Sequence, residues 1–272
     1  MRNSRILAKL RKNELAALTQ LHFVDESCWE LASLSGVDGI WMDLEHHFYS
    51  AETAARMIRA TRVGDCDVVA RCARGEFMRF ARLLEAGAAG IMYPRCEDAE
   101  EAAEIVRNTK FAPLGIRGFD GGNPDMPYCS MGFDDYLKQA NEETFVVVQI
   151  ESPKALENVE EIAAVEGVQV LFFGPADFSV LSGIPGRFED SRIKDAMRRI
   201  SKAAEANGIH WGMPMFTLDH GKELTDLGAR FLAHQSDLVM VKRGVESVVE
   251  TFEKLGFQKS DDGLNRPGTS SY

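Results

Sequence analysis

Two carboxylate residues close consecutive apolar runs of this chain of 272 residues. Glu151 follows Gln149-Ile150, and Asp177 follows Phe173-Gly174-Pro175-Ala176. Each run is typical of a buried parallel β-strand, so we expect the two carboxylates side by side at one end of a sheet. Hard carboxylate oxygens suit Mg2+ or Mn2+, with Co2+ as an alternative. A structural interpretation stays open, in which Glu151 caps the next helix and Asp177 pairs with an arginine.

His46 and Arg71 also lie where side chains could do chemistry. His46 follows Asp43 by three residues and is a candidate general base, since histidine titrates near neutral pH. A purely structural histidine is the alternative, and the adjacent His47 competes for the same role. Arg71 ends an apolar run, where a charge needs a partner or a function. It could stabilise negative charge on a substrate oxygen, or form a salt bridge with Asp43 or Glu45.

The segment Gly174-Pro175-Ala176 has no side chain long enough to obstruct the end of its strand. Backbone N–H groups there could meet a substrate carboxylate, and Gln149 would add a neutral donor. A tight turn between strand and loop is the other interpretation of the glycine.

Short apolar runs alternate with longer helical patterns, and these elements must position the candidate residues. The predicted strands cover residues 14–19, 39–43, 67–71, 90–93, 145–150, 168–173, 209–212 and 229–234. Eight such repeats favour a (β/α)8 TIM barrel of the α/β class, a single domain over residues 14–257. An open doubly wound sheet is disfavoured, because no predicted strand leads into G-x-G-x-x-G. In a barrel, residues at the C-terminal strand ends share one mouth, as the candidates here would.

Three segments depart from this rhythm. Residues 1–13 are basic and carry apolar residues at the spacing of a short amphipathic helix; a transit peptide is the alternative. Residues 110–143 are rich in Gly, Pro and Asp and predict a long functional or mobile loop. Residues 258–272 contain few apolar side chains and predict a disordered tail.

Composition indicates which kinds of partner and which cellular compartment to expect. The net charge is 31 − 42 = −11, which disfavours nucleic acid as a partner. No run approaches the roughly 20 apolar residues of a membrane span, and no apolar region predicts a secretory signal. The five cysteines lack C-x-x-C spacing and are typical of reduced thiols. We therefore expect a cytoplasmic protein with neither nucleic acid nor membrane as partner.

Four motifs carry a family resemblance. They are Trp41-Met42-Asp43-Leu44-Glu45-His46, Leu84-Glu85-Ala86-Gly87-Ala88 with Ile91-Met92-Tyr93-Pro94-Arg95, Gln149-Ile150-Glu151-Ser152, and Phe173-Gly174-Pro175-Ala176-Asp177. In order and spacing the chain resembles the HpcH/HpaI family of class II pyruvate aldolases, such as 2,4-dihydroxyhept-2-ene-1,7-dioate aldolase. The resemblance implies a (β/α)8 barrel, commonly a homohexamer. It also implies reversible cleavage of a 4-hydroxy-2-oxo acid to pyruvate and an aldehyde through a metal-bound enolate.

The same resemblance implies a role for each matching residue. The base is a histidine, an arginine stabilises the transition state, and an acidic residue raises the basicity of the histidine. The implied set is His46, Arg71 and Glu85 for catalysis, Gln149, Ala176 and Asp177 for substrate binding, and Glu151 and Asp177 for the metal. From their positions at strand ends we add Asp43 to the catalytic residues and Gly174 and Pro175 to the substrate-binding residues.

The chain departs from the family pattern in places. Glu85 stands where aspartate is common, and it precedes the fourth strand, so we expect it at the opposite rim and acting across a subunit contact. His47-Phe48 replaces a glycine followed by a small residue or proline. Residues 119–130 and 179–187 are also unusual. We expect these last three segments, unlike Glu85, to be mouth loops, so they concern the aldehyde more than pyruvate.

Two other functions stay open at the level of sequence. One is a different source of the enolate, as in an oxaloacetate decarboxylase or an acyl-CoA lyase of the citrate-lyase β type. The CoA version needs a basic phosphate-binding surface, for which the sequence gives no strong sign. The other is a non-catalytic barrel that binds 2-oxo acids, motivated by Glu85 and the altered loops.

Overall fold

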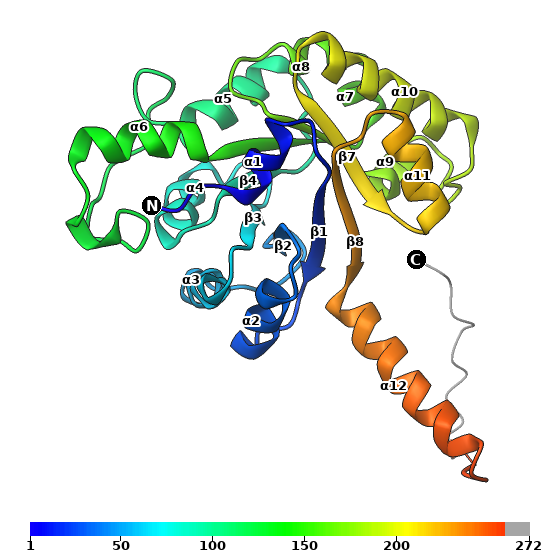
Figure 1. Ribbon diagram of the computed structural model, residues 1–272. Helices are drawn as coiled ribbons and strands as arrows, with labels where there is room; N and C mark the ends of the chain where they lie inside the picture. The colour runs from blue at the N-terminus through cyan, green and yellow to red at the C-terminus, as the bar shows by residue number, and fades with distance from the viewer. Residues whose placement is uncertain (259–272) are drawn as a thin grey trace.

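Eight short apolar strands pair in chain order, and the last pairs with the first, to form a closed parallel barrel. The computed structural model describes residues 1–258, and this barrel lies wholly within them (Figure 1). The strands are β1 Ala16–Leu21, β2 Gly39–Asp43, β3 Asp67–Arg71, β4 Gly90–Tyr93, β5 Phe145–Ile150, β6 Val170–Phe173, β7 His210–Met215 and β8 Phe231–Ser236. The predicted barrel is confirmed. Strands β2 to β5 have the predicted bounds, and the others begin one or two residues later.

Helices on the outside cover the strands, and most begin at a side chain that caps them. They are α2 Glu26–Leu34, α3 Ala51–Ala60, α4 Phe77–Ala86, α5 Ala99–Thr109, α7 Pro153–Glu157, α8 Val159–Ala163, α9 Pro175–Leu181, α10 Ser191–Ala206 and α11 Leu218–Asp226, with a 3-10 turn Thr61–Val63 after α3. For example, Ser50 caps α3 by accepting from Thr53 N, and Gly87 closes α4 at a φ of 109°. Asn158 interrupts the helical segment that follows Ser152 and separates α7 from α8.

The N-terminal segment closes one end of the barrel. Helix α1 (Arg5–Leu10) buries Ile6, Leu7 and Leu10 in the same cluster as the barrel interior. Arg5 and Lys9 both reach the buried Asp38, at 2.7 Å each. The predicted amphipathic helix is therefore confirmed, and it acts as a plug at the N-terminal strand ends. We call this end the floor and the opposite end the mouth.

The prediction of a continuous loop over residues 110–143 is wrong in its second half. Helix α6 (Phe133–Glu143) follows a short 3-10 turn, Pro127–Cys129. Its buried residues Tyr136 and Ala140, four positions apart, pack with Phe111 and Met126 in a small separate core. The density of Gly and Pro upstream hid this one-sided apolar spacing, which is that of a helix lying on a surface.

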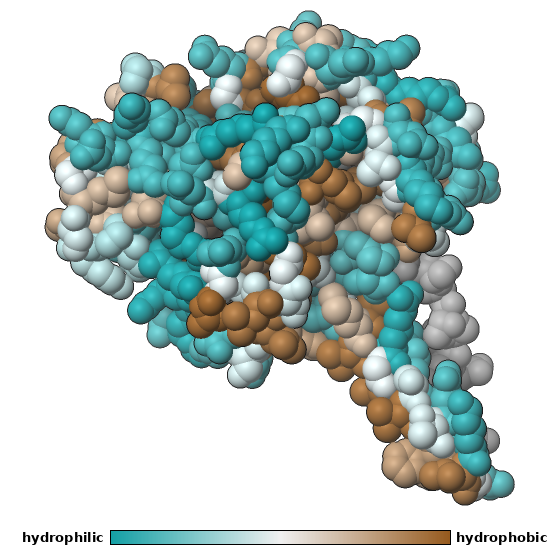
Figure 2. All heavy atoms as spheres, viewed as in Figure 1, coloured by the Kyte–Doolittle hydropathy of each residue, from teal (hydrophilic) through white to brown (hydrophobic). Residues whose placement is uncertain are grey.

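Helix α12 (Asp237–Glu253) does not cover the barrel but projects away from it (Figure 1). Its only buried residue is Asp237, at the start. Apolar side chains along it are 43–57% exposed, and Figure 2 shows them as brown spheres on the arm. They are Leu238, Met240, Val241, Val245, Val248 and Phe252.

The predicted disordered tail, 258–272, lies outside the described residues except for Gln258. Across the described part of the chain, none of the helices combines the length and apolarity that a membrane span requires.

Candidate active site

Arg71 ends β3 at the mouth, where residues of β2 and β5 hold it. Strand alternation makes Arg71 continue the inward row begun by Val69, just as Asp43 continues the row begun by Trp41. The guanidinium donates to Asp43 through Nε at 3.0 Å and Nη2 at 2.7 Å, and its Cζ lies 4.7 Å from the Trp41 ring centre. Nη1 also donates to Gln149 Oε1 at 3.3 Å. This fork fixes the orientation of Arg71 before any ligand binds.

The electrostatics of this group keep Arg71 charged. Burial lowers the pKa of Arg71, but the hydrogen bonds and charge of Asp43, with Glu45 and Glu151, outweigh burial and raise it. Burial likewise raises the pKa of Asp43, yet its bonds from Arg71 bring that pKa below its usual value. Glu45, 3.4 Å from Arg71 Nη1, keeps a raised pKa because burial exceeds the pull of Arg71. Both salt bridges predicted as alternatives for Arg71 are therefore present, and they hold it facing the mouth.

Glu151 is a buried carboxylate just beyond β5. It is only 2% exposed, and burial raises its pKa to about 7, against the opposing effect of Arg71. Oε1 accepts the backbone N–H of Arg95 at 2.8 Å, and Arg95 adopts a φ of 46°. A Cβ built on Gly174 would collide with Glu151 Oε2. The glycine thus leaves a cradle for the carboxylate, a second reason for its presence besides the turn.

Asp177 lies in the first turn of α9 and is exposed to solvent. Its charge is one of the causes that raise the pKa of Glu151, so the two carboxylates of the predicted pair interact. Glu151 does not cap the next helix, because Ser152 does so by accepting from Ala155 N at 3.0 Å. Within residues 1–258 no cluster of three or more His, Cys, Asp or Glu is arranged to hold a metal. A divalent ion here would have two protein ligands.

These two residues fit such an ion. A buried carboxylate with a raised pKa gains from a nearby cation, and two hard oxygen ligands leave room for water and a chelating substrate. Because residue 174 is a glycine, no side chain there crowds the Glu151 carboxylate.

The backbone donors predicted in Gly174-Pro175-Ala176 are fewer than the sequence suggested. The Gly174 N–H already donates to Ile150 O at 3.1 Å, and Pro175 has no N–H. A substrate carboxylate could therefore use Ala176 or Asp177, both exposed at the start of α9. Gln149 is buried and accepts from Arg71, while its amide nitrogen donates to Glu151 Oε2 at a long 3.5 Å and has a second N–H for a substrate.

Both adjacent histidines lie at the mouth. The His46 side chain is 59% exposed, with Nε2 3.6 Å from Glu45 Oε2. The His47 side chain is 34% exposed, with Nε2 3.8 Å from Asp43 Oδ2. The structure thus brings both near the Arg71 group, so His47 is a competitor for the role of His46, as the sequence suggested.

Glu85 does not join this group within one chain. It lies in the last turn of α4, directly before β4, and so near the floor, as its position in the sequence predicted. It is half-buried, and burial raises its pKa while the nearby Arg117 lowers it. Whether a second chain brings Glu85 to a mouth stays a prediction.

Sequence reasoning missed three contributors. Arg95 supplies the backbone donor for Glu151, while His22 and Asp237 form a buried hydrogen-bonded pair beside His47. Arg95 and His22 follow strand ends, which was the available signal. Local sequence does not show that Arg95 adopts a positive φ. His22 and Asp237 are 215 positions apart in the chain, and they meet because the barrel closes.

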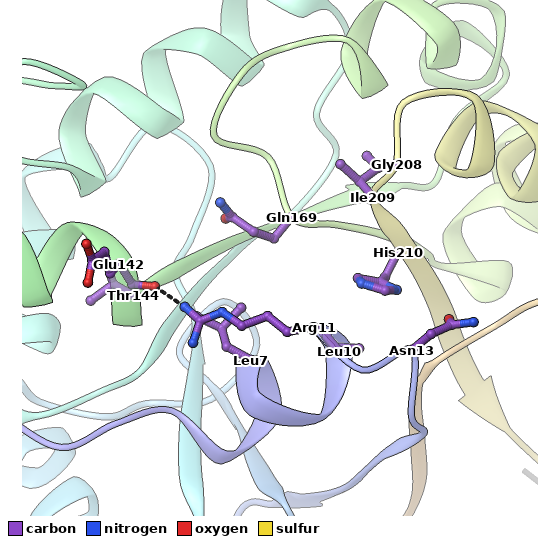
Figure 3. Close-up of a pocket in the computed structure, with 10 residues that line it drawn as sticks. All are labelled: Leu7, Leu10, Arg11, Asn13, Glu142, Thr144, Gln169, Gly208, Ile209 and His210. Carbon is purple, nitrogen blue, oxygen red and sulfur yellow. Dashed lines mark hydrogen bonds between the residues drawn. The ribbon is translucent and has the colours of Figure 1, made fainter.

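A surface pocket of about 480 Å3 lies at the other end of the barrel. Figure 3 shows α1 residues such as Leu7 and Arg11 facing Gln169 and His210, which lie beside the N-terminal ends of β6 and β7. None of the predicted site residues lines this pocket, and Arg11 there is bonded to Glu142 O and paired with Glu143. The pocket is therefore distinct from the mouth.

Fold and site together define a class of protein: a (β/α)8 barrel with acidic residues, an arginine and histidines gathered at its C-terminal strand ends. The chain belongs to the HpcH/HpaI aldolase/citrate lyase family, whose sequence model matches residues 21–243. The family resemblance seen in the motifs is confirmed.

Individual relatives agree with this assignment. A hydroxypyruvate/pyruvate aldolase of Delftia acidovorans is 32% identical over 79% of this chain and 79% of its own length. A 5-keto-4-deoxy-D-glucarate aldolase of Klebsiella pneumoniae is 29% identical over 89% of this chain and 97% of its own. The crystal structure of an HpcH/HpaI aldolase from Desulfitobacterium hafniense has a TM-score of 0.87 at 26% identity, covering 93% of this chain and 98% of that one. The chain is therefore an enzyme of the aldolase type.

Proposed function

We propose that this protein is a divalent-metal-dependent class II aldolase that reversibly cleaves a 4-hydroxy-2-oxo acid to pyruvate and an aldehyde. The observation that carries the proposal is Glu151, a buried carboxylate that Arg95 N–H and the space at Gly174 accommodate, and whose pKa is raised by burial and by the charge of Asp177. The names of the relatives, which are aldolases, support it.

Glu151 and Asp177 would hold the metal, for which Mg2+ and Mn2+ are the first candidates and Co2+ the next. When bound, the ion supplies Lewis-acid polarisation of the 2-oxo acid. The chain's own residues would orient the substrate, stabilise its charge and transfer the proton.

Arg71 would stabilise the negative charge that develops on the C2 oxygen. Because two hydrogen bonds to Asp43 already orient the guanidinium, Arg71 need not reorganise during the reaction to stabilise this charge. Gln149 and the backbone at Ala176 would orient the substrate carboxylate. This half of the site is fixed, as catalysis by preorganised groups requires.

His46 would remove the proton from the C4 hydroxyl. The C3–C4 bond then breaks, the aldehyde leaves, and its bonding electrons remain with the pyruvate half as an enolate. In the reverse direction the same groups join pyruvate to an aldehyde. Since His46 is exposed, it can reach a substrate that enters from solvent.

A decarboxylase or citrate-lyase type of cleavage is the second candidate. The family description names citrate lyase beside aldolase, which favours keeping it. Both reactions use the same enolate-stabilising group and differ in what leaves C3. The non-catalytic barrel has less support, because the family is one of enzymes and Arg71, Glu151, Asp177 and His46 are all present.

We also propose that the enzyme is a homo-oligomer, with a hexamer as the expected size. Exposed apolar residues on α12, together with Leu31 and Leu34 of α2, at 68% and 65% exposure, offer more apolar surface than a monomer usually presents (Figure 2). Glu85 near the floor could reach a mouth only in another copy. Light scattering tests this: the oligomer is expected, and a monomer at working concentration would contradict it.

A cytoplasmic location is proposed as well. All five cysteines, which lie within residues 1–258, are free thiols, and burial raises the pKa of Cys66 to about 12. Unreactive free thiols are usual in a reducing compartment. Cell fractionation would test this.

A screen for pyruvate release tests the reaction itself. Several 4-hydroxy-2-oxo acids and oxaloacetate are offered with Mg2+, Mn2+ or Co2+, each with and without chelator. Release from the hydroxy acids that stops with chelator supports the proposal. Turnover of oxaloacetate alone would replace it with decarboxylation, and activity that survives chelation would exclude the metal mechanism.

A further inference from the structure

His22 and Asp237 form a rigid pair beside the mouth. His22 follows β1, and its Nδ1 lies 2.8 Å from Asp237 Oδ1. Asp237 Oδ2 accepts the backbone N–H groups of His22 and Phe23, each at 2.7 Å, and the Asp237 side chain is only 3% exposed. Because the carboxylate accepts at Nδ1, the proton is held there and the imidazole is fixed in orientation.

His47 packs against this pair. The rings of His22 and His47 have centres 4.2 Å apart and are tilted by 57°. On its other side, His47 Nε2 lies 3.8 Å from Asp43 Oδ2, and Asp43 in turn holds Arg71. His47 is therefore held between a buried imidazole and the catalytic group, whereas His46 is more exposed and has Glu45 beside it.

The proposed reaction needs two proton transfers. One proton leaves the C4 hydroxyl as the C3–C4 bond breaks and the aldehyde carbonyl forms. The electron pair left at C3 then takes up a second proton, which gives the methyl group of pyruvate. A single histidine would have to serve both steps in turn, but this chain carries two at adjacent positions.

We propose that His47 is a second acid–base residue of the site, and that His22 and Asp237 are positioning residues that hold it toward the substrate. This inference rests on the proposed function. It assigns chemistry to the histidine by which the chain departs from the family motif, and it links the first residue of α12 to the mouth.

The charged surroundings of His47 come from several elements. His22 faces it from the end of β1, Asp43 and His46 from β2 and its loop, and Arg71 from β3. Burial first, and then His22, lower the pKa of His47, while Asp43 raises it. His47 is thus neutral near neutral pH and able to accept a proton.

The test compares His47→Gln, His46→Gln and the double variant in pyruvate release. We expect His47→Gln to lower kcat about tenfold or more with little change in KM, and the double variant to fall further than either. The acid limb of the pH profile of kcat should shift in His47→Gln. His210→Gln, which changes a histidine near the floor, is the matched control and should behave like the parent (Figure 3).

The positioning role has its own readouts. Asp237→Asn should lower kcat in the parent but add little when His47 is already glutamine, since residues that act through one another are not additive. His22→Asn keeps a donor near the Nδ1 position and should retain more activity than His22→Ala. Thermal unfolding of each variant separates these effects from loss of the fold.

Two results overturn the proposal in different ways. If the parent releases pyruvate, and His47→Gln keeps its kcat within about twofold and its pH profile unchanged, His47 has no acid–base role and the proposed function still stands. If the folded parent releases no pyruvate from any substrate offered, both the function and this role fall.

Discussion

Both ends of this barrel contain buried carboxylates, but the partners of these carboxylates differ between the two ends. At the floor, the buried Asp38 has a near-complete set of partners, because it accepts from Arg5, Lys9 and the backbone of Ala17. At the mouth, Glu151 keeps a raised pKa, with one firm backbone donor and a distant amide 3.5 Å away. Satisfied charges stabilise a fold, while incompletely compensated ones are ready for a ligand.

Activity and stability therefore depend on different ends of the barrel. The floor is closed by the apolar side of α1, so its residues should matter for folding. The mouth holds a preformed arginine and carboxylate group. Changes at the mouth should therefore reduce activity at nearly constant stability, and changes at the floor should do the reverse.

The largest expected effect is that of Arg71→Ala. Without the guanidinium, charge on the C2 oxygen loses its fixed partner, and kcat should fall about 10³-fold. Steady-state kinetics measure this, with Arg198→Ala, an exposed residue of α10 paired to Asp195, as control. A loss of less than about tenfold would mean that Arg71 is only structural.

The matching change at the floor is Ile6→Ala. Ile6 is fully buried against the barrel interior, so its truncation should cost about 3 kcal/mol of unfolding free energy while kcat stays the same. Denaturant unfolding measures the loss, and the exposed Lys12→Ala is the control. A protein that keeps its stability but loses turnover would reverse the assignment of the two ends.

Glu151→Gln should weaken metal binding by about 10²-fold, because one of two charged ligands is lost. Calorimetric titration with Mn2+ follows the affinity directly. Glu160→Gln, which alters an exposed carboxylate paired with Arg199, should bind as the parent does. Equal affinity in both variants would place the ion elsewhere.

The smallest effect should come from Asp67→Asn at the floor. Asp67 accepts from Ser4 and from Ile6 N, and burial raises its pKa from 3.8 to about 6. The folded state therefore holds this proton more tightly than the unfolded state, so stability falls as pH rises from about 3.8 to about 6. In Asp67→Asn this part of the decline should vanish, whereas the exposed Asp65→Asn should retain it. Identical pH curves in both variants would contradict the assignment.

Much of the mouth could be predicted, because residues at the C-terminal ends of barrel strands all lie at the same end of the barrel. Asp43, Arg71 and Glu151 each end or follow a strand, and parallel strands in register bring such ends together. The same rule placed Glu85 near the floor. The apolar runs and the positions where they end were therefore enough to predict the main residues of the candidate site.

Other features depend on contacts that no local pattern contains. The N–H of Gly174 is already bonded to Ile150, which only the pairing of neighbouring strands reveals. Helix α6 was hidden by the Gly and Pro before it, and the sequence of α12 gave no sign that it leaves the barrel. The pairing of His22 with Asp237 requires the first and last strands to meet.

The central claim is that Glu151 and Asp177 hold a divalent ion on which pyruvate formation depends. The most direct measurement is pyruvate release by the chelator-treated enzyme before and after Mn2+ is restored, in the parent, Glu151→Gln and Asp177→Asn. The account predicts that the parent loses its activity and regains it with Mn2+, while neither variant recovers at the same metal concentration. Undiminished turnover by the metal-free parent would contradict it.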